Sequence, residues 1–356
     1  MIHFYSILLV IFFMVHSKFE CKQVLNDNNY NIDGTIENSN WEFVRDIFKS
    51  NFHDGLDIGA SLAIYHNGKL VVDLWGGWFD KNKTIPYTND TLQLVYSTSK
   101  GIVAVAVALC VQKGLIDYNE LVTTYWPEYG QEGKENTTVA DLMSHRAGLP
   151  DFGHSFTLDD ILNWKTMTDA LEKQKPVWKP GTAHGYHAVT FGWLAGELVR
   201  RVDPEKRTLG QFIRDEITKP THTEFYIGLP AALEYRVSPL VSKNYTNFES
   251  TSNVTNPLGE EDIFNDHRIH QGEIPAANGI TNARSLARIY ASLLSDLDDG
   301  QKWLLTETIL KQATKSNTPE NEGDQVLSNL PTSFAMGFMT FGSLVLGPGS
   351  FGHNGK

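Results

Sequence analysis

A serine and a lysine three residues apart are the clearest chemical feature of this sequence. Ser97 and Lys100 stand where a polar segment passes into an apolar run, residues 102–111. Residues three apart on a helix share a face, so the lysine amine can reach the serine hydroxyl, and a desolvated lysine with a lowered pKa can take its proton. Free N–H groups at a helix start would also favour negative charge developing beside Ser97. The alternative is that Ser97 caps the helix and Lys100 is a solvated first-turn residue.

Two later motifs supply the other parts that acyl transfer needs, a proton relay and an oxyanion site. Tyr186 precedes a predicted helix, and a tyrosine held near a lysine can lose its proton at lower pH and shuttle it between Ser97 and a leaving group. His353 and Gly355 form a His-x-Gly on a predicted strand. His353 could orient or polarise a substrate there, and Gly355 would let the substrate lie against the strand edge. The alternative for Tyr186 is an aromatic residue that packs at a loop–helix junction.

The elements that must position these residues can be predicted from their patterns. Residues 102–111 are apolar on every side and are followed by Gly114, which predicts a helix buried all round, with Ser97 and Lys100 on its first turn. Asn67-Gly68 between two β-prone runs predicts a hairpin. Other helices are expected at 41–48, 138–143, 190–199, 208–217 and 283–294, and a further helix is expected to begin at residue 157. Late strands are expected at 333–341 and 344–351, and a long surface excursion is expected at 235–270.

Strands at both ends with helices between them predict an α+β fold. We expect an antiparallel sheet built from N- and C-terminal strands, with flanking helices and a helical insertion lobe. The expected organisation is a signal peptide at 1–17, a polar leader at 18–40 and one domain at 41–356.

Composition and the N-terminus restrict the partners and the compartment. The 356 residues are 41% hydrophobic and carry a net charge of −12 with no basic block, which excludes nucleic acid as a partner.

A short apolar run ending at Val15-x-Ser17 predicts a cleaved secretory signal over a signal anchor, and hence a secreted or secretory-pathway location without stable membrane insertion. Cys21 and Cys110 predict no structural disulfide, and the oligomeric state stays open. N-glycosylation sequons occur at Asn82, Asn89, Asn136, Asn244 and Asn253.

Three other patterns are weaker candidates for chemistry. Ser155 lies in a Gly-His-Ser-Phe-Thr stretch that approaches a nucleophile elbow, but it lacks the final glycine and a preceding strand, which favours a loop. His184 and His187, and His267 and His270, have spacing that zinc could use, but no HExxH or acidic third ligand accompanies them. We therefore expect no metal and no cofactor.

The order of the motifs resembles the serine β-lactamase-like and penicillin-binding-protein-like hydrolases, in particular the class C β-lactamase and esterase branch with its eukaryotic relatives. That family has S-x-x-K, then Tyr-x-Asn or Tyr-x-Ser, then Lys-x-Gly or His-x-Gly, and this sequence matches at Ser97 to Lys100, Tyr186 and His353 to Gly355. The resemblance runs from about residue 41 to 356, and includes 138–149, 178–181 and Asn278-Gly279. It implies a serine hydrolase of β-lactamase-like fold that cleaves a small-molecule or peptide ester or amide through an acyl-enzyme at Ser97. Lys100 and Tyr186 would form a coupled base pair, and His353 would line the substrate strand.

Two departures from the family pattern qualify this expectation. Ala188 stands where much of the family has Asn or Ser, so a side-chain amide contact to substrate is missing and β-lactamase activity is not expected. The family continues through two more strands and a helix after the position of Lys356, whose N–H would hold the oxyanion together with that of Ser97. An incomplete C-terminus would leave the chain poorly folded and inactive. The rival interpretation is a non-catalytic binding protein of the same fold.

Overall fold

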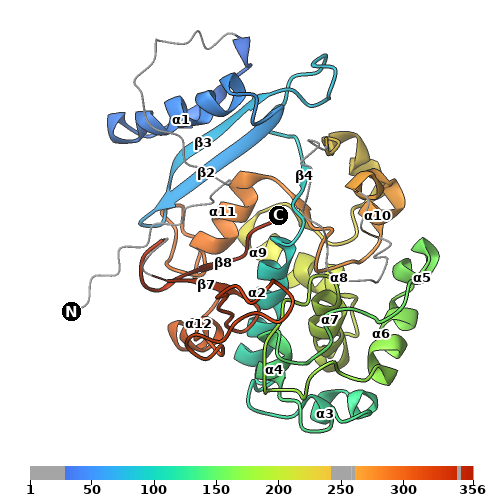
Figure 1. Cartoon of the computed structure of the whole chain (residues 1–356). Coiled ribbons are helices and arrows are strands. Elements are labelled where there is room, and N and C mark those ends of the chain that lie inside the picture. Colours follow the sequence, from blue (N-terminus) through green and yellow to red (C-terminus); the bar gives the residue numbers. More distant parts are fainter. Residues whose placement is uncertain (1–28, 242–257, 259–260, 343–345, 356) are drawn as a thin grey trace.

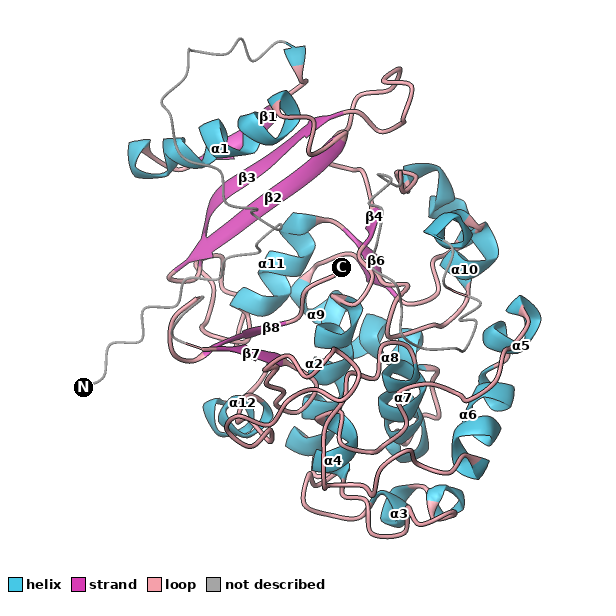
Figure 2. Ribbon diagram, in the orientation of Figure 1, coloured by secondary structure: helices cyan, strands magenta, loops and turns pink. Residues whose placement is uncertain are grey.

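A small sheet-and-helix layer lies against a larger helical lobe in this protein (Figure 1). The computed structural model describes residues 29–241, 258, 261–342 and 346–355. The expected signal peptide, Asn244, Asn253 and Lys356 lie outside the described residues. Figure 2 shows that helix α2 runs through the middle of the helical lobe, below the sheet.

The described strands form three antiparallel sheets, ordered β1-β3-β2, β4-β6-β5 and β7-β8. The strands are β1 Asp33–Ile36, β2 Gly59–His66, β3 Lys69–Gly77, β4 Gln93–Leu94, β5 Phe225–Tyr226, β6 Ile280–Thr281, β7 Met339–Phe341 and β8 Ser350–Gly352. The helices are α1 Glu42–His53, α2 Ser99–Gln112, α3 Val122–Tyr125, α4 Val139–Met143, α5 Leu158–Leu162, α6 Trp164–Lys173, α7 Thr190–Val202, α8 Leu209–Ile213, α9 Lys219–Thr221, α10 His267–Gln271, α11 Ala283–Ala291 and α12 Glu307–Ala313.

The β2–β3 hairpin turns at Asn67 and Gly68, whose φ angles of 52° and 77° confirm the predicted turn. Alternate residues of the hairpin face opposite sides. Ile64 packs toward α1, whereas Ala63 packs toward α11, so a helix covers each face (Figure 2). Strand β1 lies inside the segment that was expected to be a polar leader. Because β1 pairs with β3, this segment contributes to the sheet.

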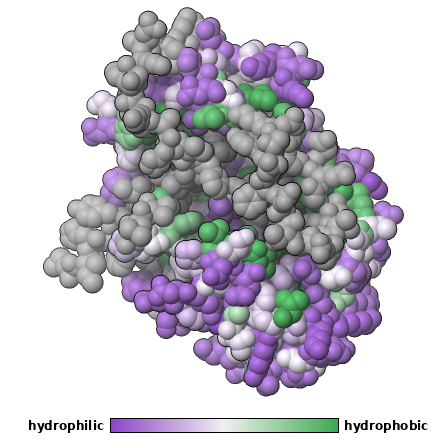
Figure 3. All heavy atoms as spheres, in the orientation of Figure 1, coloured by the Kyte–Doolittle hydropathy of each residue, from purple (hydrophilic) through white to green (hydrophobic). Residues whose placement is uncertain are grey.

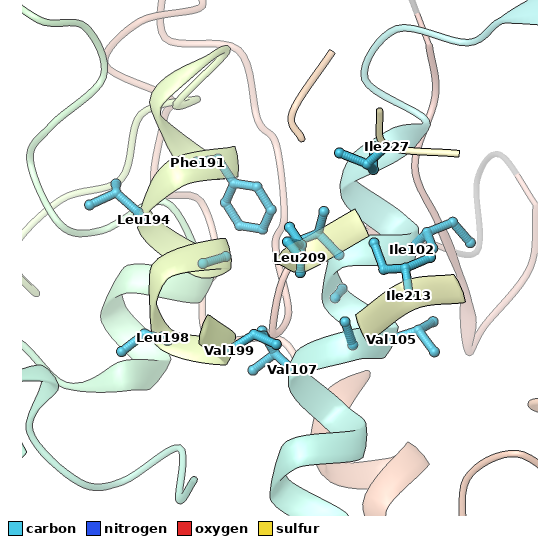
Figure 4. Close-up of a cluster of buried hydrophobic side chains, with 14 of the residues drawn as sticks. Ile102, Val105, Val107, Phe191, Leu194, Leu198, Val199, Leu209, Ile213 and Ile227 are labelled. Carbon is cyan, nitrogen blue, oxygen red and sulfur yellow. The ribbon is translucent and has the colours of Figure 1, made fainter. Parts of the chain in front are cut away.

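Helix α2 confirms the predicted buried helix, since every residue from Ser99 to Cys110 is buried. Its Ile and Val side chains pack against α7 and α8 (Figure 4), and this burial outweighs the low helix propensity of β-branched residues. Gly114 follows the helix with a φ of 69°. The helix begins at Ser99, two residues later than Ser97, because Tyr96 has a left-handed backbone that turns the chain before the helix.

The α+β fold class with antiparallel sheets and flanking helices is confirmed. In one respect the arrangement differs from the expectation: among the described strands, those of the N-terminal hairpin and those near the C-terminus belong to separate sheets. Strands β7 and β8 are also shorter than predicted. Left-handed glycines at 337, 347 and 349 interrupt the extended backbone of the two predicted runs.

The coloured part of the face shown in Figure 3 is mostly hydrophilic, with hydrophobic residues in small scattered patches. Within the described part of the chain, no helix has both the length and the apolar character needed to cross a membrane.

Candidate active site

Ser97 lies in a tight turn between β4 and α2. The preceding Tyr96 has a φ of 46°, a conformation that costs a non-glycine residue about 1–3 kcal/mol. The Ser99 hydroxyl holds this turn, because it donates to the Tyr96 carbonyl oxygen (2.5 Å) and accepts from the Gly279 N–H (2.8 Å). The Lys100 N–H donates to the Ser97 carbonyl oxygen (3.0 Å), so the two side chains still share one face.

The Lys100 amine reaches three oxygen atoms. Its Nζ lies 2.8 Å from Ser97 Oγ, 2.7 Å from the Ala188 carbonyl oxygen and 2.9 Å from the Ala276 carbonyl oxygen. The side chain is fully buried, and desolvation lowers the pKa of Lys100 well below its usual value. A neutral amine would give its two hydrogens to the carbonyl oxygens and present its lone pair to the Ser97 hydroxyl. This arrangement can accept the serine proton.

The Ala276 carbonyl is held in place by a buried asparagine. The Asn278 side-chain amide donates to the carbonyl oxygens of Ile269 and Gly272, both at 2.7 Å, and its oxygen accepts the Ile274 N–H at 3.0 Å. Asn278 therefore fixes the loop that carries Ala276. The Asn278-Gly279 pair was visible in the sequence, but its role in orienting a lysine was not.

Tyr186 lies beside Ser97 and Lys100, as the motif order predicts. Lys100 Nζ lies 4.9 Å from the centre of the Tyr186 ring. Burial raises the pKa of Tyr186, and the nearby Ser97 side chain offsets only part of this rise. The expectation that the tyrosine loses its proton more easily is therefore wrong, and Tyr186 is suited to donate a proton.

His353 joins the site as a neutral side chain. Its ring centre lies 5.9 Å from that of Tyr186, and burial lowers the pKa of His353 to about 3. Its Nδ1–H donates to the Asn354 carbonyl oxygen (2.8 Å), which leaves Nε2 as an acceptor without a partner among the described residues. His353 can therefore accept a hydrogen bond from a substrate, but it does not supply a positive charge.

Gly355 packs against the nucleophile turn. A Cβ at this position would come within 2.9 Å of the Val95 carbonyl oxygen, so no larger residue fits without movement. The Gly355 carbonyl oxygen accepts the Ser97 N–H at 3.2 Å. This N–H was expected to hold an oxyanion, and it is engaged within the protein in this structure. It must be released before it can bind a substrate oxygen.

Three of the four candidate metal-binding histidines, His184, His187 and His270, use both ring nitrogens in hydrogen bonds within the protein. His184 bonds a carboxylate and a hydroxyl, at 2.6 and 2.9 Å. His187 Nδ1–H donates to a carbonyl oxygen (2.6 Å) while Nε2 accepts a backbone N–H (3.0 Å), and both nitrogens of His270 bond oxygens at 2.7 Å. Across the residues with described positions, no group of three or more His, Cys, Asp or Glu could hold a metal ion. Ser155 is exposed in a loop before α5, with no strand before it.

Known proteins are similar to this chain in sequence and in fold. The model of the Beta-lactamase family matches residues 48–356. The sequence is 31% identical over 324 residues to the Esterase/beta-lactamase LipL of Mycobacterium tuberculosis, across 83% of this chain and 72% of that protein. A family VIII carboxylesterase superposes with a TM-score of 0.82 at 34% identity, covering 91% of this chain and 88% of the other. A penicillin-binding protein homologue from Caulobacter crescentus superposes with a TM-score of 0.80 at 32% identity, with the same coverages. The chain therefore belongs to the beta-lactamase family, within the superfamily of β-lactamase-like and penicillin-binding-protein-like serine hydrolases.

Proposed function

We propose that the protein is a serine hydrolase that cleaves a small ester or amide through an acyl-enzyme on Ser97. The observation that carries this proposal is the buried Lys100 amine, 2.8 Å from Ser97 Oγ and bonded to two carbonyl oxygens. In the described structure no carboxylate hydrogen-bonds or ion-pairs with this amine, so nothing there holds it as a cation. A lysine in this environment is a base rather than a structural charge.

Acylation starts when Lys100 Nζ takes the Ser97 proton and the serine oxygen attacks the substrate carbonyl carbon. When the tetrahedral intermediate collapses, the bond to the leaving group breaks and the leaving group takes the Tyr186 proton. The raised pKa of Tyr186 keeps this proton in place until then. The Lys100 ammonium then passes a proton to the Tyr186 oxygen, and both groups return to their neutral forms.

Deacylation uses the same base. Lys100 Nζ takes a proton from a water molecule, whose oxygen attacks the acyl carbonyl carbon. Ser97 then leaves as the alkoxide and recovers its proton from Lys100. The acid is released and the starting state is restored.

The site favours esters over β-lactams in our proposal. Ala188 is exposed beside the buried Lys100 and brings no amide group to bind a substrate side chain. One similar protein is named as a carboxylesterase, and another is named as both an esterase and a beta-lactamase. We also propose that the chain belongs to the class C β-lactamase and esterase branch, with its eukaryotic relatives, on the basis of the order of its motifs at Ser97 to Lys100, Tyr186 and His353 to Gly355.

Turnover of p-nitrophenyl butyrate by matched variants tests the proposed reaction. Ser97→Ala and Lys100→Met should each lower kcat/KM at least ~1000-fold, because each removes part of one nucleophile–base unit. Ser155→Ala should keep the activity of the wild type and serves as the control. Activity that survives Ser97→Ala, or that disappears with Ser155→Ala alone, would contradict the assignment.

We further propose that the protein is secreted and glycosylated, with its mature N-terminus near Lys18. Its apolar start and Val15-x-Ser17 support this, and Asn82, Asn89 and Asn136 are exposed and accessible to glycan transfer. N-terminal sequencing of the secreted protein, with mass analysis before and after a glycosidase, tests it. Recovery of Met1 from the cytosol would contradict it.

A further inference from the structure

We propose that Asp324 is a positioning residue for Tyr186, whose backbone it fixes so that the phenol meets the leaving group. This inference rests on the proposed hydrolase function. Asp324 is 138 residues away from Tyr186 in the sequence and belongs to no catalytic motif. Its carboxylate Oδ1 accepts the Tyr186 N–H at 3.2 Å.

The turn that carries Tyr186 needs partners from elsewhere, since it lies in no helix or strand. The Gly185 N–H donates to the His145 carbonyl oxygen (3.1 Å), and the His187 N–H donates to His145 Nδ1 (3.0 Å). The N–H between them, that of Tyr186, donates to Asp324. His145 and Asp324 thus hold three consecutive N–H groups of the tyrosine turn.

The Asp324 carboxylate is completely buried, which is costly unless its oxygens are bonded. Oδ1 also accepts the N–H groups of Val326 (2.9 Å) and Leu327 (3.0 Å), and Oδ2 accepts the Thr332 hydroxyl (2.9 Å). These three donors belong to the loop of Asp324 itself. Among the hydrogen bonds of this carboxylate, the one to Tyr186 joins the loop to the tyrosine turn.

The loop is tied to the tyrosine turn at further points. The Gln325 N–H donates to the His184 carbonyl oxygen at 3.0 Å. Thr332 gives its one hydroxyl hydrogen to Asp324, so it accepts the hydrogen bond from His184 Nε2 at 2.9 Å. Phe334, just after the loop, stacks on the Tyr186 ring with centres 6.0 Å apart and planes 10° apart. Asp324 is therefore rigid and holds Tyr186 at its backbone.

Loss of the hydrogen bond between Asp324 and Tyr186 should slow one step of the reaction, the protonation of the leaving group. A shift of about 1 Å in a reacting group can cost about 100-fold in rate. The proton that Tyr186 gives matters for an alkoxide leaving group, which is a strong base, and matters little for p-nitrophenolate, which leaves as a stable anion. A general structural defect would slow both kinds of ester equally, so the ratio of the two rates identifies a positioning role.

The test compares kcat/KM for ethyl butyrate and p-nitrophenyl butyrate. Asp324→Ala should lower the ethyl ester value about 100-fold and the p-nitrophenyl value by less than about 5-fold. Tyr186→Phe should give the same selective loss, and the double variant should lose no more than Tyr186→Phe alone, because both changes remove one function. Thr332→Val removes one donor to the carboxylate and should give a smaller loss of the same kind, about 10-fold. This variant decides the question if Asp324→Ala does not fold.

Asp203→Ala is the matched control. Asp203 is also a buried carboxylate, but it pairs with Arg207 (2.9 Å) next to the end of α7 and has no bond to the tyrosine turn. Its loss should lower the melting temperature and leave the ratio between the two esters unchanged. Equal losses on both esters in Asp324→Ala, or in Thr332→Val if the alanine variant is unfolded, would overturn the inference. A wild-type protein that cleaves neither ester would instead contradict the proposed function.

Discussion

Replacing Lys100 with methionine should change how the stability of the protein depends on pH. Burial lowers the pKa of the Lys100 amine well below its usual value in the folded protein, whereas the unfolded chain keeps its lysine protonated up to a pKa of about 10.4. Between the lowered pKa and that of the unfolded chain, the unfolded state binds more protons, and the free energy of unfolding of the wild type gains up to about 1.4 kcal/mol per pH unit from this group. Lys100→Met lacks this contribution. The difference in free energy of unfolding, wild type minus variant, should rise by up to about 3 kcal/mol between pH 7 and pH 9.

Urea unfolding followed by tryptophan fluorescence measures this difference at pH 7, 8 and 9. Other titrating groups are common to the two proteins and cancel. Lys113→Met, at the exposed end of the same helix, is the control, and its difference from the wild type should stay constant with pH. A constant difference for Lys100→Met would show that the amine is charged in the folded protein and would refute its assignment as a ready base.

Three other changes follow from the structure. Burial lowers the pKa values of His145, His187 (about 4) and His353 (about 3), so the unfolded chain binds more protons in acid. The free energy of unfolding, measured with urea, should therefore fall as the pH drops from 6.5 to 4, by up to about 1.4 kcal/mol per pH unit for each histidine. Gly279→Ala places a Cβ 2.5 Å from the Ser99 hydroxyl oxygen and should lower kcat for p-nitrophenyl butyrate at least ~10-fold. Leu198→Ala in the core of Figure 4 should cost about 2–5 kcal/mol in urea unfolding and leave kcat at 25 °C unchanged.

The parts of the site that are local in sequence could be predicted. The spacing of Ser97 and Lys100 already implies contact, and the apolar residues after them imply the burial that lowers the lysine pKa. The hairpin at Asn67-Gly68 could also be predicted, because the two turn residues determine the backbone conformation of the turn. Tyr186 and His353 were placed by their resemblance to family motifs and not by any local rule.

The parts of the site built from backbone atoms or from distant chain segments could not be predicted. The Ala188 and Ala276 carbonyl groups lie 88 and 176 residues from Lys100, and a carbonyl group has no signature in the sequence. The direction of the Tyr186 pKa shift was predicted wrongly, because the argument from the sequence considered the nearby lysine and not the burial of the phenol. The placement of the N-terminal hairpin and of the late strands in separate sheets likewise depends on tertiary contacts that strand patterns do not encode.

Labelling with a fluorophosphonate, followed by intact-mass analysis and peptide mapping, tests the central claim most directly. This claim is that Ser97 is a nucleophile activated by Lys100. One adduct per chain should form on Ser97 in the wild type and in Ser155→Ala, form much more slowly in Lys100→Met, and be absent from Ser97→Ala. An adduct on another residue, or equal labelling of Ser97→Ala, would contradict the account.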